Sequence, residues 1–151
     1  MTETFLEMAQ KFGLEIKTFS ETTRTSQDAA DAVGCELGQI GKSIIFKSSA
    51  GQPVLVIISG LNRVDINKLG QLIGEQIEKA DADFVYEATG YPIGGVPPFG
   101  HKTAIQHIFI DNDLLQYKTI WCAGGTPHTV FEIAPQKLIE AAKAKVTDIK
   151  Q

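Results

Sequence analysis

The sequence predicts an α+β fold in which helices surround a mixed, mostly antiparallel sheet. Short segments of alternating or continuous apolar residues, typical of strands, are interspersed with segments whose apolar residues recur at helical spacing. No repeat, linker or low-complexity tract separates these segments. A length of 151 residues suits a hydrophobic core of its own, so we expect residues 1–151 to form a single domain.

The N-terminal part predicts two helices and a strand. Residues 3–12 place their apolar side chains on one side of a helix, and residues 14–19 alternate as a half-buried strand does. Thr25, with a carboxylate three residues later, is typical of a helix cap. Gly34 stands where that helix would end.

A β-hairpin and a long helix follow. Residues 43–47 and 54–58 have the composition of strands, and the segment between them contains glycine and proline, as hairpin turns do. The second strand is apolar on both faces, which indicates a central position in the sheet. Asp65 can cap a helix that we expect to run to about Lys79.

The C-terminal half predicts a short helix, three strands and a closing helix. The short helix lies near residues 84–88 and ends at Gly90, and the closing helix begins at Pro135. The strands are expected at residues 105–110, 119–123 and 129–133. The inner side of the closing helix is expected to contain Leu138, Ile139, Ala142 and Val146.

Composition and charge exclude several classes of protein. The net charge of −4 does not suit an extended DNA-binding surface. No apolar run approaches the roughly 20 residues that cross a bilayer, and the N-terminus lacks the basic region of a signal peptide. Cys35 and Cys122 lie far apart without CxxC spacing, which fits a reducing cytoplasm and argues against structural zinc. We therefore expect a cytoplasmic protein without DNA or membrane partners.

The segment from Thr89 to His101 is the most unusual stretch of the chain. Four of its thirteen residues are glycine and three are proline. Glycine lets the backbone approach a ligand closely, whereas proline fixes φ and removes an N–H donor. The segment matches neither GxxxxGK[ST] nor GxGxxG. We therefore expect a stiff loop, called the Gly/Pro loop below, that forms one wall of a pocket for a polar ligand.

Lys42 is the first candidate functional side chain. Strand alternation puts it on one face with Ile44 and Phe46, which are both apolar. A lysine on such a face either lies at the mouth of the sheet or is buried. The alternative is a structural lysine at a strand end, whose stem packs on apolar neighbours while its ammonium stays in water.

A second glycine pair, Gly124 and Gly125, follows a predicted strand and precedes His128. This segment predicts either a further pocket wall, where the histidine donates a hydrogen bond, or a plain hairpin turn. His101 and His107 fit surface positions in a loop and a strand. The chain has no GxSxG or HExxH motif and no clustered carboxylate pair, so we expect neither a metal site nor a cofactor.

Three segments are informative in combination. They are residues 41–46 (GKSIIF), residues 89–100 (TGYPIGGVPPFG), and Gly124-Gly125 followed by residues 131–135 (FEIAP). Their order and spacing resemble the YbaK/EbsC family, the free-standing relatives of the editing domain inserted in bacterial prolyl-tRNA synthetase. The resemblance extends over about residues 25–138, most of the chain.

The resemblance implies a trans-editing deacylase, which hydrolyses the ester between a wrong amino acid and the 3′ end of a tRNA, typically tRNA(Pro). It also implies a mixed sheet curled into a barrel-like core. By the same resemblance, Lys42 is the key functional residue, and Gly94 and Gly95 are further candidate catalytic positions. The implied substrate-binding positions are Val96, Pro97, Gly124, Gly125 and His128.

The implied partners are the acceptor end of an aminoacyl-tRNA and prolyl-tRNA synthetase. Val96 stands where some family members carry a small polar residue, and His128 where some carry a basic or small one, so both bear on which amino acid fits. The alternative is a non-catalytic module that keeps the pocket for an aminoacyl or nucleotide ligand and docks on tRNA or a synthetase. The acidic chain is expected to touch RNA through some of Lys42, Lys47, Arg63, Lys68 and Lys102.

Overall fold

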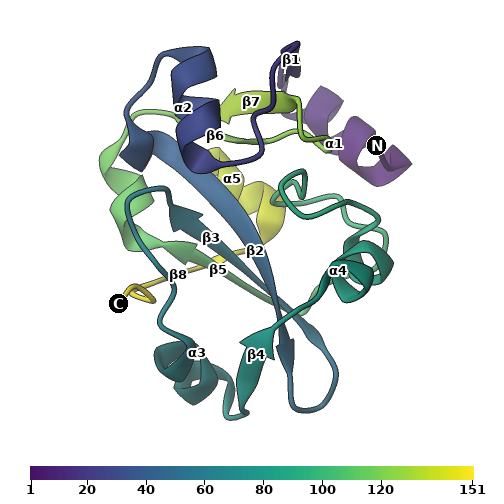
Figure 1. The fold of residues 1–151 in the computed structure, drawn as a ribbon, viewed down its shortest axis with the longest axis vertical. Helices are drawn as coiled ribbons and strands as arrows, with labels where there is room; N and C mark the ends of the chain where they lie inside the picture. The colour runs from purple at the N-terminus through teal and green to yellow at the C-terminus, as the bar shows by residue number, and fades with distance from the viewer.

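The centre of the molecule is a hairpin of two long strands, β2 (Ile40–Ser48) and β3 (Pro53–Ser59), shown in Figure 1. The computed structural model describes all 151 residues. The two strands pair antiparallel, and every residue of β3 after Pro53 is buried. The hairpin and the central position of its second strand are therefore confirmed.

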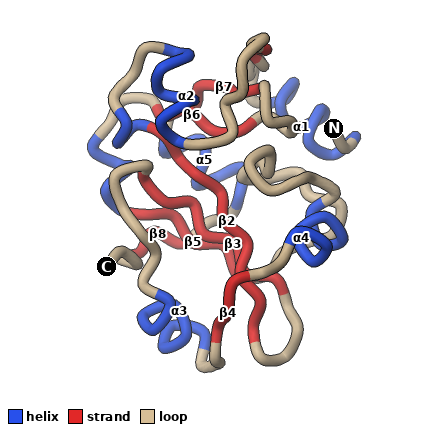
Figure 2. The backbone as a smooth tube through the Cα atoms, viewed as in Figure 1, coloured by secondary structure: helices blue, strands red, loops and turns tan.

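Six shorter strands extend this hairpin into one mixed sheet of eight strands (Figure 2): β1 (Lys17–Thr18), β4 (Ile77–Lys79), β5 (His107–Asp111), β6 (Ile120–Ala123), β7 (Thr129–Ile133) and β8 (Lys145–Thr147). The order is β1-β7-β6-β2-β3-β5-β8, and β4 pairs with the far end of β2. The pairs β2–β6, β3–β5 and β5–β8 are parallel and the other four antiparallel, as predicted. β1 and β8 do not pair with each other, so the curled sheet stays open.

Five helices surround the sheet: α1 (Glu3–Lys11), α2 (Ser26–Val33), α3 (Ile66–Ile73), α4 (Ala82–Thr89) and α5 (Pro135–Ala142). The predicted helix ends are confirmed where capping chemistry marks them. The Thr25 side chain accepts a hydrogen bond from the Asp28 N–H, and Gly34 and Gly90 end their helices in the left-handed region. Two short 3₁₀ helices complete the fold, Leu37–Gln39 and Asn112–Gln116.

The prediction of one helix from Asp65 to about Lys79 is wrong in its second half, because α3 ends at Ile73. Gly74 takes a φ of 81° and closes α3 through a hydrogen bond from its N–H to the Gly70 carbonyl. The chain then enters β4, which pairs with the last residues of β2. Ile77 packs against the core from this strand. An apolar residue at this position therefore fits the helical spacing of the sequence and also the strand that the structure shows.

Two other predictions are corrected by the structure. Only Lys17 and Thr18 of the predicted strand at residues 14–19 form a strand, because β1 is an edge that pairs with two residues of β7. Val146 is not on the inner side of α5. Lys143 ends that helix with a φ of 54°, and the chain turns into β8, where Val146 is exposed.

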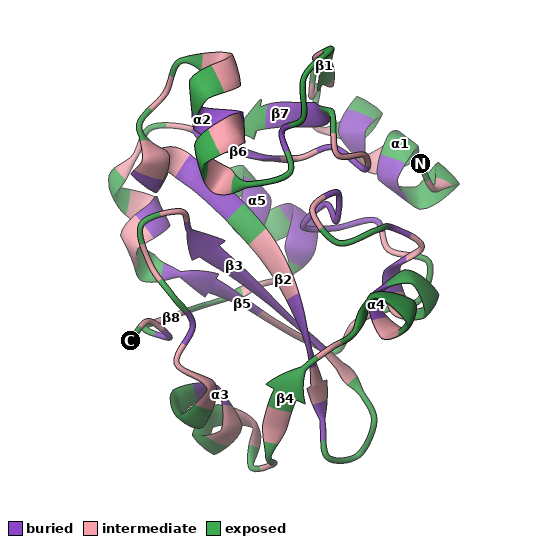
Figure 3. Cartoon of the chain, viewed as in Figure 1, coloured by how far each residue is buried: buried purple, intermediate pink, exposed green.

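The two faces of the β2–β3 hairpin bury different cores, and Figure 3 shows buried residues along both strands. Ile45, Leu55 and Ile57 point to a core that also contains residues of α1, α5 and the Gly/Pro loop; we call this side the α5 face. Phe46 and Ile58 point the other way, with Val54 and Val56, to a core closed by α3, the α3 face. The longest helix, α1, has nine residues, and no helix is long and apolar enough to cross a membrane.

Candidate functional site

The middle of β2 has a free edge. Ile40 and Gly41 pair with β6, and the last three residues of β2 pair with β4, on the side opposite to β3. Residues 42–45 therefore have no strand beside them on that side, as the course of β2 between β6 and β4 in Figure 1 shows. A strand edge without a partner leaves backbone hydrogen-bonding groups available.

A cavity of about 660 Å³ lies along this free edge, and all of residues 42–45 line it. Its other walls come from the start of α2, the segment between β3 and α3, the end of β4, α4, the Gly/Pro loop and β6. A volume of this size is typical of small-ligand sites and exceeds what a single amino acid fills.

Strand alternation divides the lining of this cavity. Lys42 lies opposite Ile58 on the α3 face, and Ser43 lies opposite Ile57 on the α5 face. Lys42 is exposed and lines the cavity, which decides in favour of a lysine at the mouth of the sheet. On the α5 face, apart from Ser43, the lining contains the buried residues Ile45, Val85, Val96 and Cys122; this part is called the apolar part below.

Four basic side chains line the cavity, and no aspartate or glutamate does. They are Arg24, Lys42, Arg63 and Lys79, all exposed. None of them takes part in the two ion pairs of the structure, which join Lys68 to Asp148 and Lys150 to Asp113. Uncompensated positive charge around a concave site attracts polyanions, even in a protein with a net charge of −4.

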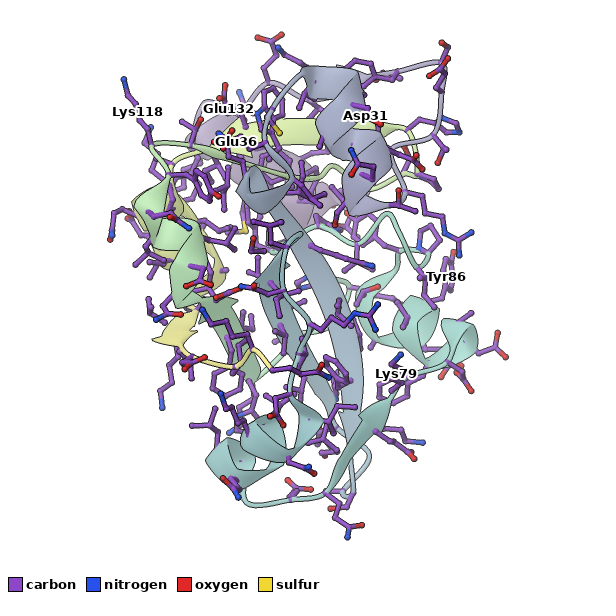
Figure 4. All side chains as sticks on the ribbon, turned by 60° about the vertical axis from the view of Figure 1, so that its left-hand side comes forward. Asp31, Glu36, Lys79, Tyr86, Lys118 and Glu132 are labelled. Atoms are coloured by element: carbon purple, nitrogen blue, oxygen red, sulfur yellow. The ribbon has the colours of Figure 1, made fainter.

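The labelled charged side chains of Figure 4 lie in two regions. Asp31, Glu36 and Glu132 lie at one end of the molecule with Lys118, around α2 and β7, whereas Lys79 lies beside α4. Lys79 is opposite Phe46 in the sheet, on the same α3 face as Lys42. Lys79 and Arg24 were not among the basic residues that the sequence indicated for RNA contact, and only the fold brings them to the cavity.

The other lysines considered for RNA contact lie outside this lining. The Lys47 ammonium lies 5.2 Å from the centroid of the Phe84 ring, and the Lys68 ammonium is 3.7 Å from an Asp148 carboxylate oxygen. Lys102 is exposed next to Gly90. Of the five, Lys42 and Arg63 line the cavity.

The Gly/Pro loop is folded into the core from residue 95 to residue 100. Gly94 and Val96 line the cavity, whereas Gly95 and Pro97 stand behind its wall. The Gly95 N–H donates to the Pro92 carbonyl at 3.0 Å, while the N–H groups of Gly94 and Val96 have no acceptor in the protein. Two unpaired amides therefore belong to residues of the cavity wall.

Contacts with α1 fix the far end of this loop. Gly100 has a φ of 74° and lies so close to α1 that a Cβ atom there would collide with the Phe5 backbone. The Tyr91 hydroxyl accepts a hydrogen bond from the Thr2 N–H at 2.8 Å and donates one to the Thr2 hydroxyl at 3.0 Å. The N-terminal helix thus belongs to the support of the cavity wall.

His101 closes the loop from within. Its Nε2 lies 2.7 Å from the Pro97 carbonyl oxygen, and because a carbonyl only accepts, the ring nitrogen donates. Burial lowers the pKa of His101, although the hydrogen bond to Pro97 acts in the opposite direction. Sequence reasoning placed His101 on the surface and missed this contact, for which no local motif gives a signal.

The turn that contains Gly124 and Gly125 lies behind the Gly/Pro loop. It is the connection of the β6–β7 hairpin, and neither glycine lines the cavity. A Cβ atom at Gly125 would stand 3.0 Å from the Tyr91 ring, and one at Gly95 would stand 3.0 Å from the Thr126 carbonyl carbon. The turn therefore supports the loop through close backbone packing.

His128 does not line the cavity and contacts the segment that precedes α2. Its Nδ1 lies 3.0 Å from the Glu21 carbonyl oxygen, and the Pro127 carbonyl accepts a hydrogen bond from the Thr23 N–H at 2.7 Å. This segment carries Arg24 across Gly94, where any Cβ atom would collide with the arginine side chain. The turn thus positions Arg24 at the cavity.

Comparison with known proteins shows the family of this chain. The family model for the aminoacyl-tRNA editing domain matches residues 20–141. The chain belongs to the aminoacyl-tRNA editing domain family. The resemblance to YbaK and EbsC proteins is thereby confirmed.

Relatives of this editing domain include free-standing proteins. YwhH of Bacillus subtilis, an uncharacterized protein, is 30% identical over 132 residues, which are 87% of this chain and 83% of YwhH. EbsC of Enterococcus faecalis, a candidate Cys-tRNA(Pro)/Cys-tRNA(Cys) deacylase, is 25% identical over 87% of this chain and 80% of EbsC. A crystal structure of a candidate trans-editing enzyme for prolyl-tRNA synthetase superposes with a TM-score of 0.90 at 38% identity, covering 100% of this chain and 99% of the other.

The chemistry available at the site of this editing domain is that of charge stabilisation. Cys122 is the one thiol of the lining, and burial raises its pKa, so it stays protonated at neutral pH and is a poor nucleophile. No group of three or more His, Cys, Asp or Glu side chains is placed to hold a metal ion. The cations and the unpaired amides are groups that can stabilise negative charge on a bound ester.

Proposed function

We propose that this protein is an aminoacyl-tRNA deacylase that acts in trans and hydrolyses the ester of mischarged tRNA(Pro). The cavity carries the proposal. Its four uncompensated cations suit the phosphates of an RNA 3′ end, and its apolar part suits a small aminoacyl group. EbsC and the structurally similar editing enzyme, whose names refer to tRNA(Pro) and prolyl-tRNA synthetase, support this choice of substrate.

In this proposal Lys42 acts on the ester. Water adds to the ester carbonyl carbon, and the Lys42 ammonium together with the amides of Gly94 and Val96 stabilises the oxyanion that forms. The tetrahedral intermediate then expels the 3′ oxygen of the terminal ribose, which takes up the proton that the attacking water has given up. The products are the free amino acid and the tRNA 3′ hydroxyl. An aminoacyl ester is already activated, so the reaction needs no strong protein nucleophile.

The remaining candidate positions receive supporting roles in the same proposal. Gly95 and Pro97 shape the loop that holds the two free amides. Gly124 and Gly125 allow the turn to pack against that loop, and His128 holds the segment that carries Arg24. We further propose that the protein works in the cytoplasm alongside prolyl-tRNA synthetase, where its two free cysteines stay reduced.

A deacylation panel tests this function. The protein is incubated with tRNA(Pro) carrying alanine, cysteine or serine and with correctly charged Ser-, Ala- and Thr-tRNAs, and release of the amino acid is followed. We expect hydrolysis of at least one mischarged tRNA(Pro). Binding of tRNA without hydrolysis of any member of the panel would instead favour the non-catalytic module.

Within the panel, Lys42→Ala is expected to lower kcat/KM by about 100-fold or more, the usual scale for loss of one oxyanion-stabilising group. Lys47→Ala is the matched control, because Lys47 lies on the same strand but outside the cavity lining. The control should keep its activity. Full activity of Lys42→Ala would rule out the assigned role.

A further inference from the structure

The hydroxyl of Ser43 has no hydrogen-bond partner although it is buried. It is the only buried side-chain polar atom of the whole chain without one. Ser43 lines the cavity at the free edge of β2, directly after Lys42. Leaving a buried hydroxyl unpaired costs about 1–3 kcal/mol, so such a group in a cavity wall indicates a partner supplied by a ligand.

The surroundings of this hydroxyl are apolar. Ser43 lies opposite Ile57, and Ile57 belongs to the same buried cluster as Ile45, Val85 and Val96. The four cations of the cavity include Lys42 and Lys79, which lie on the other face of the sheet. The Ser43 hydroxyl is therefore a polar side-chain group in the otherwise apolar part of the cavity, which suits an amino-acid side chain.

The backbone of Ser43 is free as well. The Ser48 N–H bonds to the Gln52 carbonyl and the Gly60 N–H to the Ile40 carbonyl, so the even-numbered residues of β2 direct their backbone groups to β3. By alternation, the N–H and C=O of Ser43 face the opposite side, where neither β6 nor β4 pairs with this residue. The hydroxyl and the backbone of Ser43 together form a small polar site.

We propose that Ser43 determines which amino acid is removed, by hydrogen bonding a hydroxyl on the substrate side chain. This inference rests on the proposed function and deepens it: the substrate class is tRNA carrying a small hydroxylated residue, of which serine is the smallest, in preference to alanine. A purely apolar pocket discriminates poorly between such close analogues. A buried polar group that needs a partner discriminates against the analogue that lacks one.

The proposal is tested by binding, so that it does not depend on turnover. The probes are acceptor-stem RNAs of tRNA(Pro) that end in a non-hydrolysable 3′-seryl-amide or 3′-alanyl-amide. The wild-type protein should bind the seryl probe about tenfold more tightly, the scale of one net hydrogen bond. Ser43→Ala should reduce this preference to near one by weakening the seryl probe alone.

Two controls distinguish a role of the Ser43 hydroxyl in substrate selection from a role in the stability of the fold. Ser48→Ala removes another buried serine of β2, whose hydroxyl accepts from the Gln52 N–H and lies outside the cavity; it should keep the preference. The Tm of Ser43→Ala should equal or exceed that of the wild type, because the substitution removes an unpaired polar group. A purely structural role of this hydroxyl would lower the Tm instead.

Equal affinity of the wild type for both probes would overturn the proposal. An equal loss of both probes in Ser43→Ala would also overturn it, since the hydroxyl would then contact a group common to all aminoacyl esters. Hydrolysis of the matching seryl and alanyl esters is followed in parallel. A seryl preference in binding without any hydrolysis would support the role of Ser43 while rejecting the deacylase.

Discussion

Single residues decide how closely the elements around the cavity approach one another. Gly94 and Gly100 both lie in the left-handed region, but their neighbours differ. At Gly94 the nearest atoms belong to the flexible Arg24 side chain, whereas at Gly100 they belong to the Phe5 backbone. A side chain at residue 100 would therefore have to displace α1 itself.

We expect Gly100→Ala to lower the free energy of unfolding by about 3 kcal/mol or more, since it combines a disfavoured φ with a backbone clash. Gly51→Ala is the matched control. Gly51 has a φ of 81° but no atom within 4 Å of a new Cβ, so its cost is that of φ alone, about 1–2 kcal/mol. Urea unfolding of both variants provides the test. Equal losses would show that the contact with Phe5 carries no cost.

At the scale of elements, the site depends on β2 changing partners along its length. The strand leaves β6 after Gly41 and meets β4 at Phe46, and the cavity occupies the interval. The Gly/Pro loop closes this interval and is itself held by the hydrogen bond from His101 to Pro97. The stiffness of the loop therefore depends on a neutral, half-buried imidazole.

The folded protein is expected to lose stability as the pH falls below about 6.5. Burial lowers the pKa of His101 below its ordinary value of 6.5, so the unfolded chain takes up a proton that the folded chain does not. This contribution is fully present above pH 6.5 and is lost towards the lower folded pKa. Asp113 and Glu75, whose pKa values are lowered by hydrogen bonds, act in a more acidic range.

Urea midpoints between pH 7.5 and 5.5 test this expectation. His101→Gln should flatten the decline over this range, whereas His107→Gln removes a histidine of β5 and should leave the decline in place. If His101→Gln declines as steeply as the wild type, the titration belongs to another group.

At the scale of the whole molecule, the charge of the cavity lining differs in sign from the net charge of the chain. The chain carries a net charge of −4, yet the cavity is lined by four basic side chains and by no aspartate or glutamate. Binding of RNA should therefore be local, at the cavity, and strongly dependent on salt. A broad basic face, as in duplex-binding proteins, is not needed for contact with an acceptor end.

Arg24→Gln, Arg63→Gln and Lys79→Gln should each weaken the binding of uncharged tRNA(Pro). Each should also reduce the slope of log Kd against log salt by about 0.7, the value for one lost phosphate contact on a single strand. Lys68→Gln is the control, because Lys68 is exposed, outside the cavity and near Asp148. Binding titrations at several salt concentrations provide the slopes. An unchanged slope in all three variants would place the RNA elsewhere.

Short-range sequence patterns account for the local features of this protein. Capping at Thr25, the glycines that end α2 and α4, and the central hairpin all follow from short-range patterns, because these depend on neighbouring residues. The resemblance carried by three motifs also gave the family and drew attention to Lys42. The family is confirmed, whereas the roles of the predicted site residues remain predictions.

The residues that meet at the cavity are brought together by long-range packing in the fold. The free edge of β2 arises because Gly41 pairs with Cys122 while Phe46 pairs with Lys79, and no local pattern encodes such registers between distant segments. The same long-range packing brings Arg24 onto Gly94 and leaves the Ser43 hydroxyl without a partner. The sequence specifies the chemistry of each side chain, but the pairing of distant strands determines which of these side chains lie together at the cavity.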